Sequence, residues 1–322
     1  MEDIKVSFII PCYNAQTYIQ SCVTSIQPTA VSYEIIVVND GSLDDTWRVI
    51  EQLRQNRQEI RLLNKENEGV NAARRDGWRM AKGEYVCFVD ADDTICQNSE
   101  IWAWLEKGYD IIKAGGYYVN GSTRILYHNH YIGEIRDMEH AYDLMLEGKL
   151  LPFIHSSIYR KKIIDDDCFD ISPRFKIGED LLFNLKLMGK VKRMVSIESA
   201  FYSYRMNVDS VMHTKIWGFS YIKAFNDELG RLILQQVPDL ERKVIIHRFL
   251  DYVGTMLFPE VDYRHEYYQE INTLLGEYPW VKSYAPKKNV LFIGQETLYR
   301  MYLSLFHFIQ KCRGKGRRAI ID

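Results

Sequence analysis

The sequence lacks a surplus of either charge and lacks any long apolar stretch. Its 322 residues carry 41 lysines and arginines against 43 aspartates and glutamates, a formal net charge of −2. Without an overall positive field there is no basis for bulk binding of nucleic acid, so contacts with anions must be local. No stretch approaches the roughly 18 to 20 apolar residues that span a bilayer, and the acidic start MEDIKV lacks the positive charge of a signal peptide. We therefore expect a cytoplasmic protein, with peripheral contact to the inner face of the membrane as the alternative.

Paired cysteines and glycine-rich phosphate loops are also missing. The six cysteines are scattered without a CxxC pair, so neither zinc-ligand spacing nor a disulfide framework is visible. Neither GxGxxG nor GxxxxGK[ST] occurs, and another group must therefore neutralise any phosphates that the chain binds. Internal repeats and low-complexity tracts are absent too. The hydrophobic content of 47% is ample for one large domain with an appendage.

The first ninety residues alternate short apolar runs with helical periodicity. Strands are expected at 6–10, 34–38, 60–63 and 85–89, and helices after Asn14 as N-cap, at 45–56 and at 71–81. The run 34–38 is almost continuously β-branched, which is typical of a parallel strand covered on both faces. The alternation predicts an α/β fold with a doubly wound, mostly parallel sheet flanked by helices.

The pattern changes after residue 100. A hairpin turning at Asn120-Gly121 is expected within 116–127, helices at 138–146 and after 177–180, and extended segments at 193–197 and 201–205. Beyond residue 214 the sequence predicts helices at 216–235, 241–257, 264–276 and 294–310. We therefore divide the chain into a sheet domain of residues 1–213 and a helical region of residues 214–322.

Acidic residues follow two of the predicted strands. Asp40 ends the second strand, and Asp90, Asp92 and Asp93 follow the fourth. Ligands of open α/β sheets bind outside the carboxyl ends of the strands, where these acids should meet. Acids so close together repel one another unless a cation such as Mg²⁺ or Mn²⁺ joins them, and on an extended chain Asp90 and Asp92 would face the same side. A solvated acidic turn or a helix cap would also explain this motif if it stood alone.

Four segments in order closely resemble the family 2 glycosyltransferases of the GT-A fold. They are VSFIIPCYN (6–14), EIIVVNDGS (34–42), NEGVNAARRDGWRMAKG (67–83) and FVDADD (88–93). The similarity is dense over residues 4–95 and looser to about residue 213. It implies transfer of a sugar from a nucleotide-sugar to a hydroxyl, with inversion at the anomeric carbon and with Mn²⁺ or Mg²⁺ as cofactor.

The resemblance also implies roles for individual residues. Asp40 would hydrogen-bond a uracil ring, which makes a UDP-sugar the expected donor, while Asp90 would contact ribose and Asp92 the metal. The remaining residues expected at the nucleotide-sugar site are Pro11, Tyr13, Asn14, Gly41, Ser42, Asn71, Arg74, Ala91 and Arg205. Asp90 and His213 are further candidate metal ligands, although a hydrogen-bonded structural histidine is the commoner case. Arg75 stands where the family often places Asn.

An inverting transfer needs a general base that takes a proton from the attacking hydroxyl. Asp180 in the segment IGEDL resembles the glutamate-aspartate motif of the family and is the expected base. Glu179 is the second candidate, or a group that orients Asp180 and the acceptor. Both carboxylates would also suit a helix N-terminus without any catalytic role.

The C-terminal end carries an apolar stripe followed by basic residues. The stripe consists of Leu298, Met301, Tyr302, Leu305, Phe308 and Ile309, and the basic residues are Lys311, Arg313, Lys315, Arg317 and Arg318. A core helix with a solvated terminus is the commoner explanation, and attachment to an anionic membrane would suit a lipid-linked acceptor. Acceptor binding, membrane contact and self-association all stay open for this region.

The leading hypothesis is a metal-dependent inverting glycosyltransferase of hexosyl or N-acetylhexosaminyl type that extends a surface polysaccharide or a similar glycan. A sugar-phosphate nucleotidylyltransferase would need a glycine-rich basic loop where this chain has PCYN. A non-catalytic nucleotide-sugar sensor or scaffold with the same fold is the alternative from another class. It predicts donor binding without product.

Overall fold

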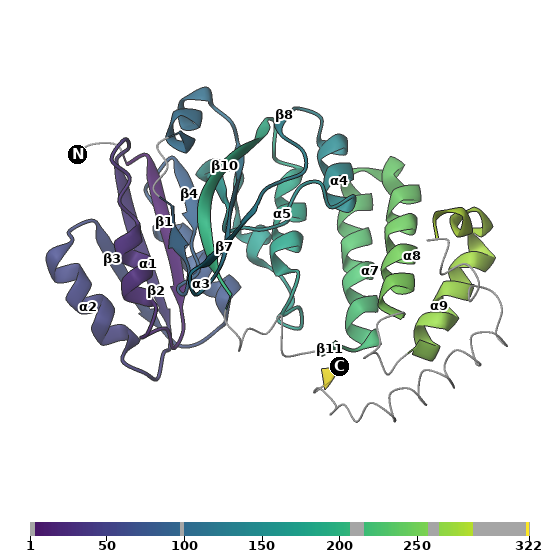
Figure 1. The fold of residues 1–322 in the computed structure, drawn as a ribbon, viewed down its shortest axis with the longest axis horizontal. Helices are drawn as coiled ribbons and strands as arrows, with labels where there is room; N and C mark the ends of the chain where they lie inside the picture. The colour runs from purple at the N-terminus through teal and green to yellow at the C-terminus, as the bar shows by residue number, and fades with distance from the viewer. Residues whose placement is uncertain (1–3, 97–99, 207–215, 257–263, 286–319, 322) are drawn as a thin grey trace. The chain divides into compact units, whose positions relative to one another are not determined.

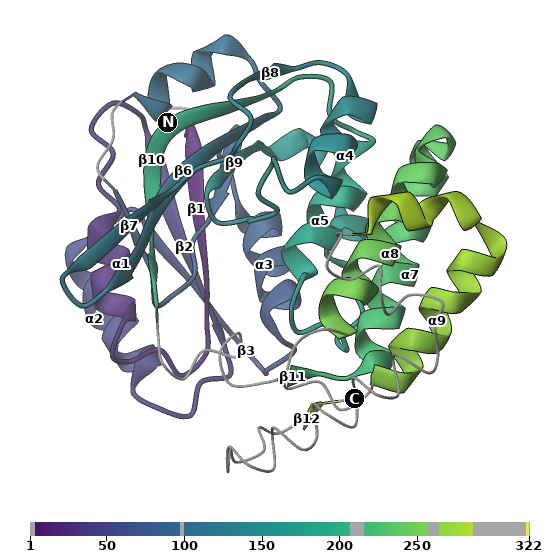
Figure 2. The same ribbon diagram turned by 45° about the vertical axis from the view of Figure 1, so that its right-hand side comes forward.

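The computed structural model describes residues 4–96, 100–206, 216–256, 264–285 and 320–321 (Figures 1 and 2). The chain forms two compact units, residues 1–207 and 208–322. The predicted boundary between residues 213 and 214 lies outside the described ranges and stays a prediction. The first unit contains the large sheet, and the second is mainly helical.

Four parallel strands form one half of the sheet. They are β1 (Val6–Cys12), β2 (Tyr33–Asp40), β3 (Ile60–Lys65) and β4 (Tyr85–Phe88), in the order β3-β2-β1-β4. The helices between them are α1 (Ile19–Ser25), α2 (Thr46–Asn56) and α3 (Val70–Met80). The predicted alternation of strands and helices is therefore confirmed, and all four strands end at the same edge.

Alternate residues of β1 pack on opposite faces of this sheet. Phe8 and Ile10 share an apolar cluster with residues of α1, including Val23. Ile9 points to the other face, where α3 lies so close that a Cβ on Gly77 would come within 2.4 Å of the Ile9 Cγ2 atom. Both faces are thus covered by helices, as the continuous apolar runs predict.

The other half of the sheet is mixed. It contains β9 (Ser157–Arg160), β6 (Ile111–Asn120), β10 (Met194–Arg205) and β5 (Thr94–Ile95), following β4 in that order, with β7 (Thr123–Tyr127) and β8 (Gly133–Ile135) beside them. Strand β9 is antiparallel to β4 and to β6. The hairpin at Asn120-Gly121 is confirmed. The two extended segments expected at 193–197 and 201–205 are one irregular strand, β10.

The α-helices of the first unit match the prediction except at one start, and its 3-10 helices were not predicted. Helices α4 (Met138–Leu146) and α5 (Glu179–Met188) are found where they were expected, and the 3-10 helices are η1 (Ile101–Lys107), η2 (Lys161–Ile163) and η3 (Asp166–Phe169). The prediction that Asn14 caps α1 is wrong, because this helix begins at Ile19. Asn14 instead adopts a positive φ of 50°, which asparagine tolerates. Its side-chain oxygen accepts a hydrogen bond from the Leu43 N–H in the loop after β2.

The second unit has an apolar cluster of its own. Its helices are α7 (Phe219–Gln236), α8 (Glu241–Met256) and α9 (Arg264–Glu277), with η4 (Pro238–Leu240), η5 (Pro279–Tyr284) and the short pair β11 (Ile216–Trp217) and β12 (Ile320–Ile321). Phe249, Tyr252 and Ile271 lie in the cluster. The helix expected at 294–310, with its apolar stripe and most of the basic end, lies outside the described residues. Among the helices that the structure describes, none has the length and apolarity to cross a membrane.

Candidate active site

The loops after β1 and β2 are tied together at the carboxyl edge of the sheet. The Asn14 N–H donates to Ser42 Oγ at 2.9 Å, and Asn14 Oδ1 accepts from the Leu43 N–H at 2.8 Å. Pro11 is buried within β1, whereas Tyr13 is 49% exposed. These two hydrogen bonds hold Asn14 against Ser42 and Leu43, so two of the residues expected at the nucleotide-sugar site lie together.

Asp40 links the end of β2 to the start of α3. Its two carboxylate oxygens accept the backbone N–H groups of Glu68 at 3.0 Å and Gly69 at 2.8 Å. Gly41 has a positive φ of 72°, and a Cβ there would come within 2.8 Å of the Asn67 backbone nitrogen. The buried carboxylate therefore positions the N-terminal end of α3, where Asn71 lies.

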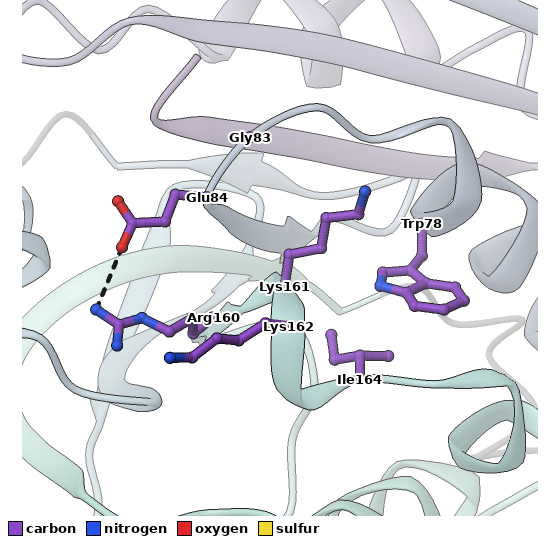
Figure 3. A pocket seen from close by; sticks show the side chains of 7 residues that line it. All are labelled: Trp78, Gly83, Glu84, Arg160, Lys161, Lys162 and Ile164. Carbon is purple, nitrogen blue, oxygen red and sulfur yellow. Dashed lines mark hydrogen bonds and ion pairs between the residues drawn. The ribbon is translucent and has the colours of Figure 1, made fainter. Parts of the chain in front are cut away.

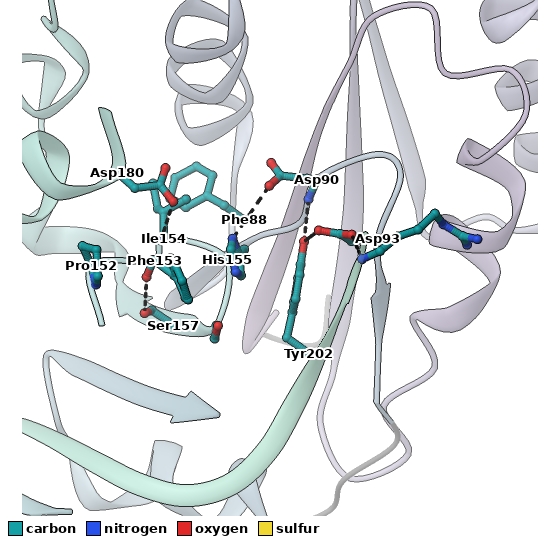
Figure 4. Close-up of polar contacts among 12 residues, drawn as sticks. Phe88, Asp90, Asp93, Pro152, Phe153, Ile154, His155, Ser157, Asp180 and Tyr202 are labelled. Carbon is teal, nitrogen blue, oxygen red and sulfur yellow. Dashed lines mark hydrogen bonds and ion pairs between the residues drawn. The ribbon is translucent and has the colours of Figure 1, made fainter. Parts of the chain in front are cut away.

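The Asp90–Asp93 segment is a tight turn, with the Asp93 N–H donating to the Asp90 carbonyl at 3.0 Å. The expectation that Asp90 and Asp92 lie on an extended chain is therefore wrong. The Tyr202 hydroxyl accepts the Asp90 N–H at 3.0 Å and donates to Asp93 Oδ2 at 2.8 Å (Figure 4). Burial, together with the charges of Asp90 and Asp92, raises the pKa of Asp93 well above its usual range. The Asp93 side chain is buried in the protein interior, and Ala91 is buried within the turn.

Arg205 closes this turn from β10. Its N–H donates to Asp93 Oδ1 at 2.6 Å, and its Nε donates to the Asp92 carbonyl at 2.8 Å. The guanidinium lies 5.2 Å from the centre of the Tyr18 ring. Arg205, expected at the nucleotide-sugar site, is thus beside the predicted metal ligand.

Arg74 joins Asp90, which is expected to contact ribose, to Asp180, which is the expected general base. Its Nη2 donates to Asp90 Oδ1 at 3.0 Å and its Nη1 to Asp180 Oδ1 at 3.1 Å, although Arg74 and Asp180 are 106 positions apart. The arginine is only 3% exposed. Burial would lower its pKa, but the charges of Asp180 and Asp90 outweigh burial and raise it. The guanidinium therefore stays charged and links the two carboxylates across the site.

Asp180 lies in the first turn of α5, beside a loop that the sequence did not single out. Its Oδ2 accepts the Ile154 N–H at 3.0 Å (Figure 4). Asn184, one turn further along α5, donates to the carbonyls of Asp180 and Pro152. Burial and the charge of Asp180 raise the pKa of Glu179 to about 7. Both acids of the predicted pair are thus placed at the site, with different environments.

His155 and Lys113 are functional candidates that the sequence reasoning missed. His155 is 5% exposed, stacks on the Tyr202 ring and places Nδ1 3.8 Å from Asp90 Oδ2 (Figure 4). Burial lowers its pKa. Lys113 is buried and donates to the Phe153 carbonyl and to Ser157 Oγ. Neither residue lies in a recognisable motif, so only the pairing of β9 with β4 and β6 could have revealed them.

The residues at the turn suit a divalent cation whose coordination shell is completed by oxygens of the substrate. Within the ranges that the structure describes, no three histidine, cysteine, aspartate or glutamate side chains gather into a metal site. Asp92 is partly exposed at the carboxyl edge of the sheet, while Asp90 is held by Arg74. Mg²⁺ typically takes one or two protein carboxylates and receives its other ligands from phosphates and water. The donor set therefore suits Mg²⁺ or Mn²⁺ bound together with a diphosphate, and His213 lies outside the described residues.

A separate hollow of about 550 Å³ lies at the opposite end of β4 (Figure 3). Glu84 precedes β4, and its carboxylate pairs with Arg160 at 3.2 Å. None of the predicted site residues lines this hollow. Because ligands of such sheets bind at the carboxyl ends, we do not assign the active site to it.

Comparison with known proteins agrees with this geometry. The family model described as glycosyl transferase family 2 matches residues 7–168, half of the chain. The chain belongs to glycosyl transferase family 2. The matched stretch includes Asp40, Arg74, Asp90 and Asp92 and ends before Asp180.

Relatives and solved structures of this family extend the comparison. The chain is 27% identical to the glycosyltransferase GlyA of Streptococcus pneumoniae over 76% of its own length, but spans only 37% of GlyA. It is 26% identical to the Bacillus subtilis protein EpsH over 66% of its own length and spans 64% of that protein. Residues 1–349 of S. aureus TarS in complex with UDP-GlcNAc superpose with a TM-score of 0.63 at 22% identity, covering 89% of this chain and 83% of that one. This likeness confirms the predicted GT-A fold.

Proposed function

We propose that this family 2 chain is a metal-dependent inverting glycosyltransferase. It moves a sugar from a UDP-sugar to a hydroxyl of a glycan or of a lipid-linked acceptor, in the synthesis of a surface polysaccharide. UDP-GlcNAc, the ligand of the similar TarS structure, is the first donor to test. The observation that carries the proposal is the Arg74 bridge between Asp90 and Asp180.

The bridge supports catalysis because it fixes the donor side and the acceptor side of the reaction relative to each other. Asp90 belongs to the turn expected to hold ribose and diphosphate, and Asp180 is the expected base. An arginine that is buried and bound to both carboxylates has little freedom to let them separate. Such positioning of the reacting groups is itself a large part of enzymatic rate enhancement.

Asp180 takes the proton from the attacking acceptor hydroxyl in this proposal. Its Oδ2 is oriented by the Ile154 N–H, and its Oδ1 by Arg74. Arg205 stands beside Asp92 and offsets negative charge on the departing nucleoside diphosphate. Asp92 would hold Mg²⁺ or Mn²⁺, which when bound would supply electrostatic stabilisation of that same leaving group.

The test is release of nucleoside diphosphate from UDP-, GDP- and dTDP-sugars with mixed glycan acceptors. We expect turnover with one donor, loss of turnover on metal chelation and recovery with Mn²⁺ or Mg²⁺. Asp180→Asn should lower kcat by about 10²-fold or more, because general bases contribute about 10²- to 10⁴-fold. Nucleotide affinity of Asp180→Asn should change little.

Two further variants complete this experiment. Asp92→Asn should abolish the response to metal, and Glu51→Gln on the exposed side of α2 is the matched control that should behave as wild type. Donor binding without product from any acceptor, unaltered by Asp180→Asn, would favour the non-catalytic sensor instead. Absence of nucleotide binding would contradict both hypotheses.

A further inference from the structure

The loop that precedes β9 contacts both sides of the candidate site (Figure 4). The Ile154 N–H donates to Asp180 Oδ2 at 3.0 Å, on the side of the proposed base. The next residue, His155, stacks on the Tyr202 ring with 4.5 Å between the ring centroids. The Tyr202 hydroxyl in turn accepts the Asp90 N–H at 3.0 Å and so holds the turn after β4. Two adjacent residues of one loop therefore connect the base to the turn that is expected to bind the donor.

The imidazole of His155 is fixed by the rings around it. The Phe153 ring is almost parallel to it, with centroids 4.8 Å apart and an interplanar angle of 18°, and Figure 4 shows His155 between Phe153 and Tyr202. The carbonyl of Phe153 is itself held by Lys113 at 3.2 Å. Because His155 is buried among these groups, it has little room to rotate. A side chain locked by packing in this way can hold another group in place.

The edge of the imidazole faces the Asp90 carboxylate. Nδ1 of His155 lies 3.8 Å from Asp90 Oδ2, whereas Nε2 is buried and has no hydrogen-bond partner among the residues that the structure describes. A charged ring has a proton on both nitrogens. In a neutral ring the single proton belongs on Nδ1, because on Nε2 it would be a buried donor without an acceptor. In either state an N–H group of His155 therefore faces Asp90.

The two oxygens of the Asp90 carboxylate face different donors. Oδ1 accepts from Arg74 Nη2 at 3.0 Å, and Oδ2 faces His155 across 3.8 Å, which exceeds the length of a hydrogen bond. Hydrogen bonds in enzyme sites are often long before the substrate binds and shorten in the complex. A small rotation of the carboxylate toward the imidazole would give each oxygen one donor and would leave Asp90 a single orientation.

We propose that His155 is a positioning residue for sugar transfer, whose Nδ1–H orients Asp90 toward the ribose of the donor and whose ring keeps the turn after β4 in place through Tyr202. The proposal rests on the glycosyltransferase function above and adds to its donor site a residue that lies outside every motif. His155 touches neither substrate nor metal in this role. Because it acts through Asp90, nucleotide affinity should depend on it more strongly than kcat does.

The test follows UDP binding to the full chain by saturation-transfer NMR in EDTA, and measures donor KM and kcat separately in the presence of Mg²⁺. Binding in EDTA reports on the contact with the nucleotide without metal and without any sugar transfer. Thermal unfolding shows whether each variant is folded.

Two variants separate the N–H group from the ring. His155→Phe keeps an aromatic ring against Tyr202 and removes Nδ1. We expect its Kd for UDP and its donor KM to rise at least about tenfold, the effect of losing one hydrogen bond to a charged group, with kcat lowered less than about threefold. His155→Asn removes the ring but places an amide N–H close to the position of Nδ1, so it should bind UDP within about threefold of wild type. His140→Phe, at an exposed position of α4, is the matched control and should behave as wild type.

Each contrary result is distinct. A ring that only packs predicts the reverse order, with His155→Phe equal to wild type and His155→Asn impaired, and this order would overturn the proposal. Equal loss of UDP affinity in both folded variants would overturn it as well, because the amide N–H would then have failed to replace Nδ1. If His155→Asn does not fold, wild-type UDP affinity in His155→Phe is still sufficient to overturn it. UDP binding in the expected order without turnover of any donor would contradict the proposed function and support the role of His155 in nucleotide binding.

Discussion

The three acids after β4 differ in their surroundings. Asp90 pairs with Arg74, and Asp93 accepts from the Tyr202 hydroxyl and the Arg205 amide. Protein groups thus bind Asp90 and Asp93, and the partly exposed Asp92 is the acid expected to contact the metal. The sequence predicted the cluster of carboxylates. It could not predict which partner each carboxylate binds, because Tyr202 is 112 positions from Asp90.

Tyr202→Phe tests the anchoring of this turn. The change removes the acceptor of the Asp90 N–H and the donor to Asp93, leaving buried polar groups unpaired. Unsatisfied buried groups cost about 1 to 3 kcal/mol, so the free energy of unfolding should fall by about that amount. The donor KM should rise as well, because the turn that carries Asp92 loosens. Urea unfolding and donor titration measure the two effects.

Tyr252→Phe is the matched control for stability. The Tyr252 hydroxyl is buried in the second unit and finds no hydrogen-bond partner in the described part of the chain. Its removal should leave stability unchanged or slightly higher. An equal loss in both variants would mean that ring packing, and not the hydrogen bonds of Tyr202, anchors the turn.

Helix α3 packs directly on the sheet and carries Arg74 of the candidate site. Gly77 packs on Ile9 and Val38, and Arg74 on the same helix holds the two carboxylates. Gly77→Ala would place a Cβ 2.4 Å from Ile9 Cγ2 and push the helix outward. We expect a loss of about 1 to 3 kcal/mol in unfolding free energy and a lower kcat.

Gly254→Ala in α8 is the control that separates the effect of this clash on stability from the effect of the higher helix propensity of alanine. A Cβ at Gly254 meets no atom within 4 Å. Alanine is favoured over glycine in a helix interior by about 0.5 to 1 kcal/mol, so this variant should be more stable than wild type. Thermal unfolding of both proteins makes the comparison, and a stabilised Gly77→Ala would contradict the close packing of α3.

Elements with strong local patterns were predictable from the sequence, and elements defined by distant partners were not. The strands of the first ninety residues and helix α4 follow their periodicity closely. The antiparallel strand β9 and the segment 152–157 were missed because they are short and are fixed by contacts with β4, β6 and α5. Asn14 was misassigned because its side chain bonds Leu43 across a loop.

The candidate site shows the same division. Asp40, Arg74, Asp90 and Asp180 were named from motifs, and the structure brings the last three together through one guanidinium. His155 reaches Asp90 from a loop without a motif. These side chains meet only because the strands of the mixed half of the sheet pair as they do. The local periodicity of the sequence does not encode that pairing.

On the scale of the whole molecule, the buried Lys113 makes stability depend on pH. Burial lowers its pKa to about 8, although the charge of Asp180 acts in the opposite direction. In the unfolded chain a lysine titrates near 10.4. Between these two values the unfolded chain holds a proton on this lysine that the folded protein lacks. Stability therefore rises with pH through this window, since it rises wherever the unfolded state binds more protons.

Lys113→Met should abolish this contribution. Methionine fills a similar space, and Ser157 Oγ still donates to the Phe153 carbonyl at 3.0 Å. From pH 8 to 10, wild type should therefore gain unfolding free energy relative to the variant, on the order of 3 kcal/mol by the end of the window. Urea unfolding at pH 7.5, 8.5 and 9.5 gives the difference. Lys162→Met, at an exposed position, should keep the wild-type profile. Parallel profiles for wild type and Lys113→Met would show that Lys113 keeps an ordinary pKa and that water reaches it beneath the 152–157 segment.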